Sequence, residues 1–166
     1  VTNNFSNWGQ FPLIYFLILM FIGGCAGSTA CGIKIFRVQI LYQFLSNQLK
    51  KIIYPRGIFN IKYENNNVNE KFMASIISFI FLYILIFFII TALLTIDGLN
   101  FTTAISAAAT SISNVGPGLG DIIGPNGNFS QLSDFSKWIL STGMILGRLE
   151  LFAILVLFIP SFWRKY

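Results

Sequence analysis

The residues best suited to covalent chemistry in this sequence lie close together, between Gly23 and Lys34. Cys25 and Ser28 are nucleophile types, and Lys34 is a residue type that can act as a base. A nucleophile of this kind needs an activating partner. The sequence contains no His, and no carboxylate lies near this segment. The pattern therefore argues against an enzyme.

Two glycine-containing stretches also miss the spacings that bind phosphate. In GSTACGIK, Gly27 to Lys34, the lysine is displaced by one position from the P-loop pattern. In GPGLG, Gly116 to Gly120, the spacing is G-x-G-x-G, and no strand or downstream acidic partner completes a dinucleotide site. The two cysteines lack the pattern of a zinc site or a disulfide framework, so they are interpreted as small packing residues.

A different chemistry is available to the backbone between Asn100 and Gly127, NFTTAISAAATSISNVGPGLGDIIGPNG. Residues 101–112 suit a helix of ~18 Å, which enters only part of a bilayer, and Gly116 and Pro117 stop it. Irregular backbone at membrane depth must be buried in protein or line a watery cavity. A half-helix that returns as glycine-containing chain can present carbonyls to a dehydrated cation. The alternative is an external Gly/Pro loop folded over the helix ends.

The elements that position this segment are predicted to be membrane spans. The chain has 166 residues, of which 55% are hydrophobic and only 10% charged, whereas soluble domains carry about 25% charged residues. The longest uncharged run, Phe72 to Ile96, exceeds the ~30 Å hydrocarbon core. Residues 133–163 form a second candidate span. Phe11 to Ile22 is too short unless the span continues, interrupted, through the small residues that follow.

Charge is segregated along the chain and predicts its orientation. Lys and Arg are concentrated between Gly32 and Phe72 and recur at Arg164 and Lys165, whereas residues 97–136 contain neither. The positive-inside rule places the basic linker and the C-terminus in the cytoplasm and residues 97–136 outside. Cations would be concentrated there by the acidic residues Asp97, Asp121 and Asp134. The basic charge thus indicates a membrane protein and no nucleic-acid partner.

Arg148 is the most informative charged residue, because it lies inside a predicted span. A charge near the bilayer centre costs at least ~2.5–3.5 kcal/mol, so its side chain should face a pore or a partner. Glu150 is two positions away and points to a different helix face, so the two should not pair within one helix. For Lys34 and Arg37 two interpretations stay open: an anchor on the positive side of the membrane, or, for Lys34, a role in positioning the neighbouring loop.

Several long motifs resemble one known family. GGCAGSTACGIK, ATSISNVGPGLG, LSDFSKWILSTGMILGRLELF and PSFWR are similar to the TrkH/KtrB family of bacterial potassium-uptake proteins, in the family's order and spacing. The resemblance implies potassium as the transported ligand, with no covalently bound cofactor. It also implies a multi-pass homodimer in the lipid bilayer of the bacterial inner membrane and a cytoplasmic nucleotide-binding regulatory subunit, TrkA- or KtrA-like. The alternative is a related cation transporter that moves sodium as well as potassium.

The resemblance also implies a domain organisation and an all-α integral membrane fold. Family members have four potassium-channel-like M1–P-loop–M2 repeats in one chain, and this sequence resembles a C-terminal fragment. Residues 1–50 correspond to the end of the third repeat, with a broken pore-lining helix. Residues 51–71 correspond to a cytoplasmic linker, and 72–166 to the fourth repeat. Within that repeat the segments are a transmembrane helix at 72–96, a pore helix at 101–112, a filter at 113–118 and a transmembrane helix at 133–163.

The family's functional residues carry over position by position. The filter that binds potassium corresponds to Ser113, Asn114, Val115 and Gly116, with the carbonyls of Asn114, Val115 and Gly116 as ligands. Arg148 corresponds to the arginine on the last pore helix that faces the family's gating loop and forms a positive barrier below the filter. An intramembrane gating loop corresponds to Gly23, Gly24, Cys25, Ala26, Gly27, Ser28, Thr29, Ala30, Cys31, Gly32 and Lys34.

Two features of this loop qualify the resemblance. Cys31 stands where the family usually has glycine, so its Cβ is expected to restrict the loop backbone. Gly23 and Gly27 have G-x-x-x-G spacing, for which helix packing is the structural alternative.

Overall fold

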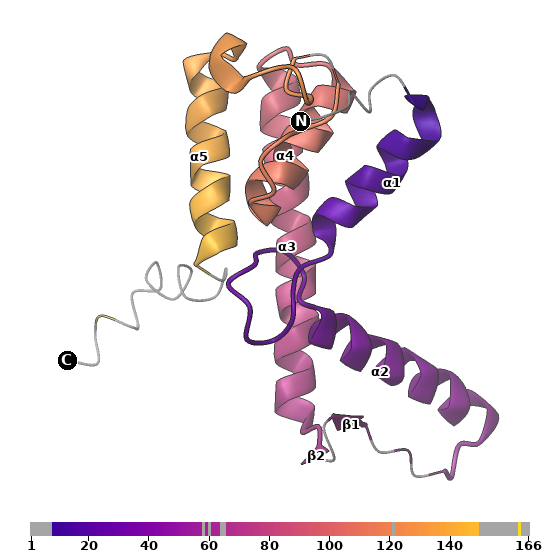
Figure 1. The fold of residues 1–166 in the computed structure, drawn as a ribbon. Coiled ribbons are helices and arrows are strands. Elements are labelled where there is room, and N and C mark those ends of the chain that lie inside the picture. Colours follow the sequence, from indigo (N-terminus) through magenta and orange to yellow (C-terminus); the bar gives the residue numbers. More distant parts are fainter. Residues whose placement is uncertain are drawn as a thin grey trace.

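The long helix α3 is the axis on which the other elements are arranged (Figure 1). The computed structural model describes residues 8–57, 59, 61–63, 66–120, 122–149 and 163. In chain order its elements are α1 (Gln10–Phe21), α2 (Ile35–Ile53), β1 (Lys62–Tyr63), β2 (Asn66–Asn67), α3 (Glu70–Ile96), α4 (Phe101–Ser113), a 3₁₀ turn (Phe129–Gln131) and α5 (Asp134–Arg148).

Helix α3 has 27 residues and begins two residues before the predicted span. It carries no charge beyond its first turn, and among the described helices it is the one long and apolar enough to cross a membrane. Its buried residues recur every three or four positions, from Met73 through Phe79, Tyr83 and Phe87 to Leu94. This spacing places them on one face, and the bulky residues of the opposite face are exposed.

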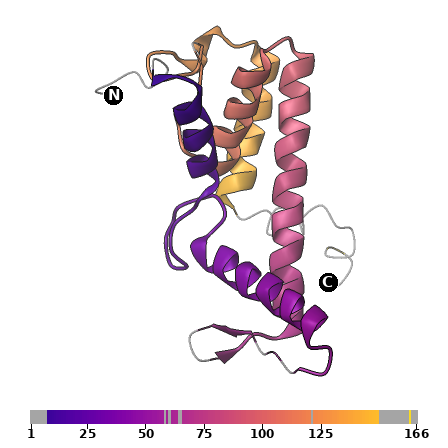
Figure 2. The same cartoon turned by 90° about the vertical axis from the view of Figure 1, so that its right-hand side faces the viewer.

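Three shorter helices, α1, α4 and α5, surround the half of α3 that ends at Ile96 (Figures 1 and 2). Helix α4 is the innermost, because every residue from Thr103 to Ser113 except Ile105 is buried. Its Ala, Ser and Thr side chains are small, which lets the neighbouring helices approach its backbone closely. Helix α4 ends one residue beyond the predicted 101–112.

The chain that returns after α4 is tied back onto that helix. The Ser106 hydroxyl donates to the Leu119 carbonyl and accepts from the Leu119 amide, both at 3.1 Å. The Gly118 amide donates to the Ile123 carbonyl at 2.8 Å. The segment after the helix is therefore held against α4.

Helix α2 leaves the bundle and lies against the opposite half of α3, together with the β1–β2 hairpin (Figure 2). Ile40 of α2 packs with Met73 and Ile76 of α3. The two strands are antiparallel, with Lys62 paired to Asn67. Residues 51–71, predicted as a linker, thus include the end of α2 and this hairpin.

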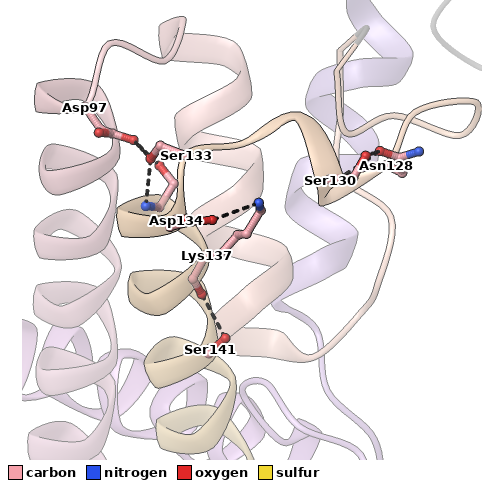
Figure 3. Close-up of polar contacts among 8 residues, drawn as sticks. Asp97, Asn128, Ser130, Ser133, Asp134, Lys137 and Ser141 are labelled. Carbon is pink, nitrogen blue, oxygen red and sulfur yellow. Dashed lines mark hydrogen bonds and ion pairs between the residues drawn. The ribbon is translucent and has the colours of Figure 1, made fainter.

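At the end of α3 that is marked by Ile96, two serine hydroxyls donate hydrogen bonds to one carboxylate (Figure 3). Ser133, which caps α5, donates to Asp97, and the Ser136 hydroxyl donates to the same oxygen at 2.6 Å. These hydrogen bonds, that of Ser133 foremost, lower the pKa of Asp97 below its ordinary value. Asp134 forms an ion pair with Lys137 at 3.2 Å. Two of the three acidic residues expected to attract cations therefore already have partners, and Asp121 lies outside the described residues.

Helix α5 accounts for the first half of the predicted span at 133–163. It begins at Asp134 and ends at Arg148. Residues 150–162 lie outside the described residues, and with them Glu150 and its predicted lack of pairing with Arg148.

Candidate functional site

The segment that follows α4 has an unusual backbone that leaves its carbonyls open. Asn114 adopts a left-handed conformation, with φ 53°, and Gly116 has φ 114°, which favours glycine. Within the described part of the chain, the carbonyl oxygens of Asn114, Val115 and Gly116 accept no hydrogen bond. Open carbonyls on a short irregular segment can coordinate a monovalent cation.

This segment is held from three sides. From α4, the Thr110 hydroxyl accepts from the Gly116 amide at 2.9 Å, and the Thr110 carbonyl accepts from the Val115 amide at 3.1 Å. From α5, the Met144 carbonyl accepts from the Asn114 side-chain amide at 3.0 Å. From α3, the Tyr83 hydroxyl lies 2.6 Å from the Ser113 hydroxyl. The segment is thus fixed by neighbours on three helices.

Two glycines of α5 bring this helix unusually close to α4. A Cβ added to Gly147 would lie 1.9 Å from the Ile112 carbonyl oxygen, and one added to Gly143 would lie 2.9 Å from the Ser111 hydroxyl oxygen. Both distances are shorter than real Cβ contacts. The last turn of α5, which ends at Arg148, is therefore seated directly against the end of α4.

The segment between α1 and α2 is a closed loop with a hydrogen-bonded neck. The Gly23 amide donates to the Ile33 carbonyl at 2.9 Å, and the Ile33 amide donates to the Phe21 carbonyl at 3.0 Å. Gly32 has φ 87°, and a Cβ on Gly23 would lie 2.7 Å from the Cys31 carbonyl oxygen. Gly23 and Gly27 lie outside any helix, so the helix-packing interpretation of their spacing is wrong.

Cys31 occupies the neck without backbone strain. Among the described residues other than glycine, only Asn114 has positive φ, so the Cys31 backbone lies in a region open to side chains. The need for glycine falls on its neighbour Gly32 instead. Both cysteines are free thiols.

The loop tip contains few contacts. Residues 25–30 are all exposed, and the Ser28 hydroxyl accepts from the Ala30 amide at 3.1 Å. The Lys34 ammonium lies 3.5 Å from the Ala26 carbonyl oxygen, a long contact that joins the base of the loop to its tip.

Arg148 joins this loop to α5. Its guanidinium donates to the Thr29 carbonyl at 2.8 Å and lies 3.9 Å from the Cys31 sulfur. A cavity of about 380 Å³ is lined together by loop residues 23, 24 and 28–31, by Ser113, Asn114 and Val115, and by Arg148. A second cavity, of about 240 Å³, is also lined by loop residues 28–32 and by Arg148, with Tyr83 and Gly147. The structure therefore brings the predicted filter, loop and arginine around one space.

The arrangement suits the binding of a bare cation by backbone oxygens rather than a resident metal. Among the described residues, no group of three or more His, Cys, Asp or Glu side chains could hold a metal ion. The residues that line the shared cavity include Ser113, Asn114 and Arg148. The chain can thus attract a cation at the open carbonyls and repel it at the arginine.

Comparison with known proteins places the chain in a family. Residues 1–165 match the family model TrkH, described as a cation transport protein. The chain belongs to the TrkH family. This confirms the resemblance seen in the sequence, and a cation transporter is not an enzyme.

Individual relatives agree with this assignment. The chain is 43% identical over 164 residues to the Trk system potassium uptake protein TrkI of Halomonas elongata, a match that covers 99% of this chain and 33% of that protein. It is 34% identical to the Trk system potassium uptake protein TrkH of Escherichia coli K12, with the same coverage. The crystal structure of the potassium transporter TrkH from Vibrio parahaemolyticus matches with a TM-score of 0.87 and 34% identity, over 98% of this chain and 34% of that one. The chain thus spans about a third of the length of these TrkH-family relatives.

Two features of this TrkH-family site were missed in the sequence although signals for them exist. Gly143 and Gly147 have the G-x-x-x-G spacing that marks close helix packing. Tyr83 is a hydroxyl in the middle of an apolar run, and such a group requires a buried partner. Ser113 supplies that partner from 30 residues away.

Proposed function

We propose that this chain is part of a potassium-uptake protein of the bacterial inner membrane. In this proposal α3, α4 and α5 form a potassium-channel-like M1–P-loop–M2 repeat, with α4 as the pore helix and residues 113–118 as the filter. Support comes from the similarity to potassium transporters and from the open carbonyls of Asn114, Val115 and Gly116. The cation is bound there without its water shell, because carbonyl oxygens replace it.

The loop between α1 and α2 is the proposed gate. The observation that carries this part is the cavity shared by the loop, the filter and Arg148. The guanidinium holds the loop tip through the Thr29 carbonyl and puts a positive charge below the open carbonyls. A potassium ion leaving the filter meets both the loop and this charge, so the closed state does not leak. Displacement of the loop opens the path.

The proposal extends to the whole protein. Four such repeats would surround one pore, with the chain supplying the end of the third and the fourth. The basic residues of the α2–α3 linker support a cytoplasmic position for the linker and the C-terminus. The assembly would be a homodimer, controlled by a TrkA- or KtrA-like nucleotide-binding subunit. The relatives above are named for potassium uptake, so potassium is proposed ahead of the alternative in which sodium is also moved.

The test replaces Arg148 by Ala in the full-length protein reconstituted in vesicles. Removal of a positive charge within several ångströms of a passing cation lowers the barrier, so the basal potassium flux should rise roughly ten-fold or more. Lys137→Ala is the matched control, because it removes a positive charge from the other end of the same helix. An unchanged basal flux in a well-expressed Arg148→Ala protein, or an equal rise in the control, would contradict the barrier role.

A further inference from the structure

Tyr83 is a buried hydroxyl that the proposed filter and gate do not yet use. It lies midway along α3, its side chain is 1% exposed, and its oxygen is 2.6 Å from the Ser113 hydroxyl oxygen. Ser113 is the last residue of α4 and directly precedes the open carbonyls. Loss of either hydroxyl would leave the other buried without this partner. The pair therefore fixes where α4 ends relative to α3.

The hydrogen bonds that hold the filter segment come from different helices, and the one to Tyr83 comes from α3. Thr110 acts from within α4, and Asn114 reaches the backbone of α5. Tyr83, in contrast, lines the cavity of about 240 Å³ together with loop residues 28–32 and Arg148. Tyr83, which contacts the first residue of the filter segment, thus also lines a cavity together with the loop.

Aromatic contacts connect Tyr83 to both ends of the loop. Phe21 is the last residue of α1, its carbonyl forms part of the loop neck, and its ring meets Tyr83 edge-on with a centroid distance of 6.2 Å. One turn earlier on α3, the Phe79 ring lies 6.0 Å from Tyr83. On the other side of the loop, the Arg37 guanidinium of α2 stacks 3.8 Å from the centroid of Phe79. The helices before and after the loop therefore both bear on the same face of α3.

We propose that Tyr83 is a positioning residue for ion selection, which holds the end of α4 and the filter carbonyls in register with the neck of the loop. This inference rests on the proposed function. A carbonyl site discriminates between ions by the number and placement of its oxygens. A shift of the Ser113 end of α4 moves those oxygens, so the relative binding of potassium and sodium must change with it.

The test is Tyr83→Phe in the full-length protein, measured as the ratio of potassium to sodium flux in vesicles. The ring and its packing remain, and only the hydroxyl is lost. The ratio should fall about three- to ten-fold, the factor that corresponds to one buried hydrogen bond. Tyr42→Phe is the matched control, because Tyr42 is an exposed tyrosine on α2, and it should leave the ratio unchanged.

A double-mutant cycle separates positioning from general packing. Ser113→Ala removes the other end of the same hydrogen bond, so the double variant should be little worse than either single one. Additive losses would overturn the proposal. A lower melting temperature with an unchanged flux ratio in Tyr83→Phe would also overturn it, because the hydroxyl would then serve stability alone.

A third variant separates failure of this inference from failure of the proposed function. Gly116→Ser changes the proposed filter directly and should reduce potassium preference. If the wild type shows no potassium preference, or if Gly116→Ser retains it in full, the filter assignment fails and the Tyr83 inference falls with it. If both behave as expected and Tyr83→Phe keeps the wild-type ratio, only the inference about Tyr83 is wrong.

Discussion

Two of the glycine-containing segments between helices, the one after α4 and the one between α1 and α2, are held in opposite ways. The break after α4 is fastened to three helices: to α3 by the Tyr83 side chain, to α4 by the Thr110 side chain, and to α5 by its own Asn114 side chain, which donates to a backbone carbonyl. The break between α1 and α2 is closed by its own backbone at the neck, and its exposed tip meets the rest of the molecule mainly at Arg148. Similar residue types thus produce a segment with several side-chain contacts in one place and an exposed segment with few contacts in the other. The two segments differ in the residues that contact them, since both contain glycines.

The comparison predicts that one added methyl group is most damaging beside the fixed break. Gly147→Ala places a Cβ against the Ile112 backbone, which no rotamer change relieves. We expect a loss of about 3 kcal/mol or more in stability, measured as a lower melting temperature of the full-length protein. Gly27→Ala in the loop tip meets no atom within 4 Å and should leave the melting temperature unchanged. Equal effects of the two substitutions would remove the distinction between fixed and loose regions.

A second substitution tests whether the loop is released by strain at its neck. Gly32→Ala forces a side chain into a left-handed conformation, at a cost of about 1–2 kcal/mol. Because the cost falls on the closed neck, basal potassium flux should rise about five- to thirty-fold, the factor that corresponds to this cost. Gly98→Ala carries the same kind of strain, at φ 92°, in the turn after α3, and should leave basal flux unchanged. If Gly32→Ala lowers stability but not the closed-state barrier, the loop is not the gate.

The smallest effect on stability is expected from the hydrogen bonds of Asp97 to Ser133 and Ser136, which lie away from both glycine-containing segments. Its pKa is lowered in the folded protein, so its stabilising contribution is present above the ordinary value of 3.8 and is lost as the pH falls through the lowered pKa. Stability should therefore be flat with respect to this group from pH 5 to pH 8. Asp97→Asn should lower the melting temperature slightly, whereas Asp134→Asn, which breaks an exposed pair, should not. A larger loss in Asp134→Asn would refute this ranking.

The sequence predicted the regular elements better than their contacts. The apolar run of α3 and the small-residue run of α4 are local patterns, and both helices lie within two residues of where those patterns placed them. The motifs also sufficed to identify the TrkH family. The roles of the filter residues, the loop and Arg148 stay predictions, supported by their position around one cavity.

What the sequence could not provide depends on pairs of distant residues. The contact between Tyr83 and Ser113 joins positions 30 apart. The resemblance placed Arg148 opposite the loop, but it did not name Thr29, 119 positions away, as the partner. The hydrogen bonds of the loop neck could not be predicted from the sequence either, because they join backbone groups that nearly every residue carries. The expectation that the Cys31 Cβ restricts the loop backbone stays a prediction, and in the structure the φ that favours glycine belongs to Gly32.

The neck has a consequence for how the protein can vary. Its hydrogen bonds join Phe21 and Gly23 to Ile33, so the end of α1 is connected to the chain just before α2 without the residues of the tip. The tip, residues 25–30, is a loop that extends from these hydrogen bonds. The length and composition of the tip can therefore change by insertion or deletion without altering where α1 ends or α2 begins, so the tip can vary in evolution separately from the helices that carry it.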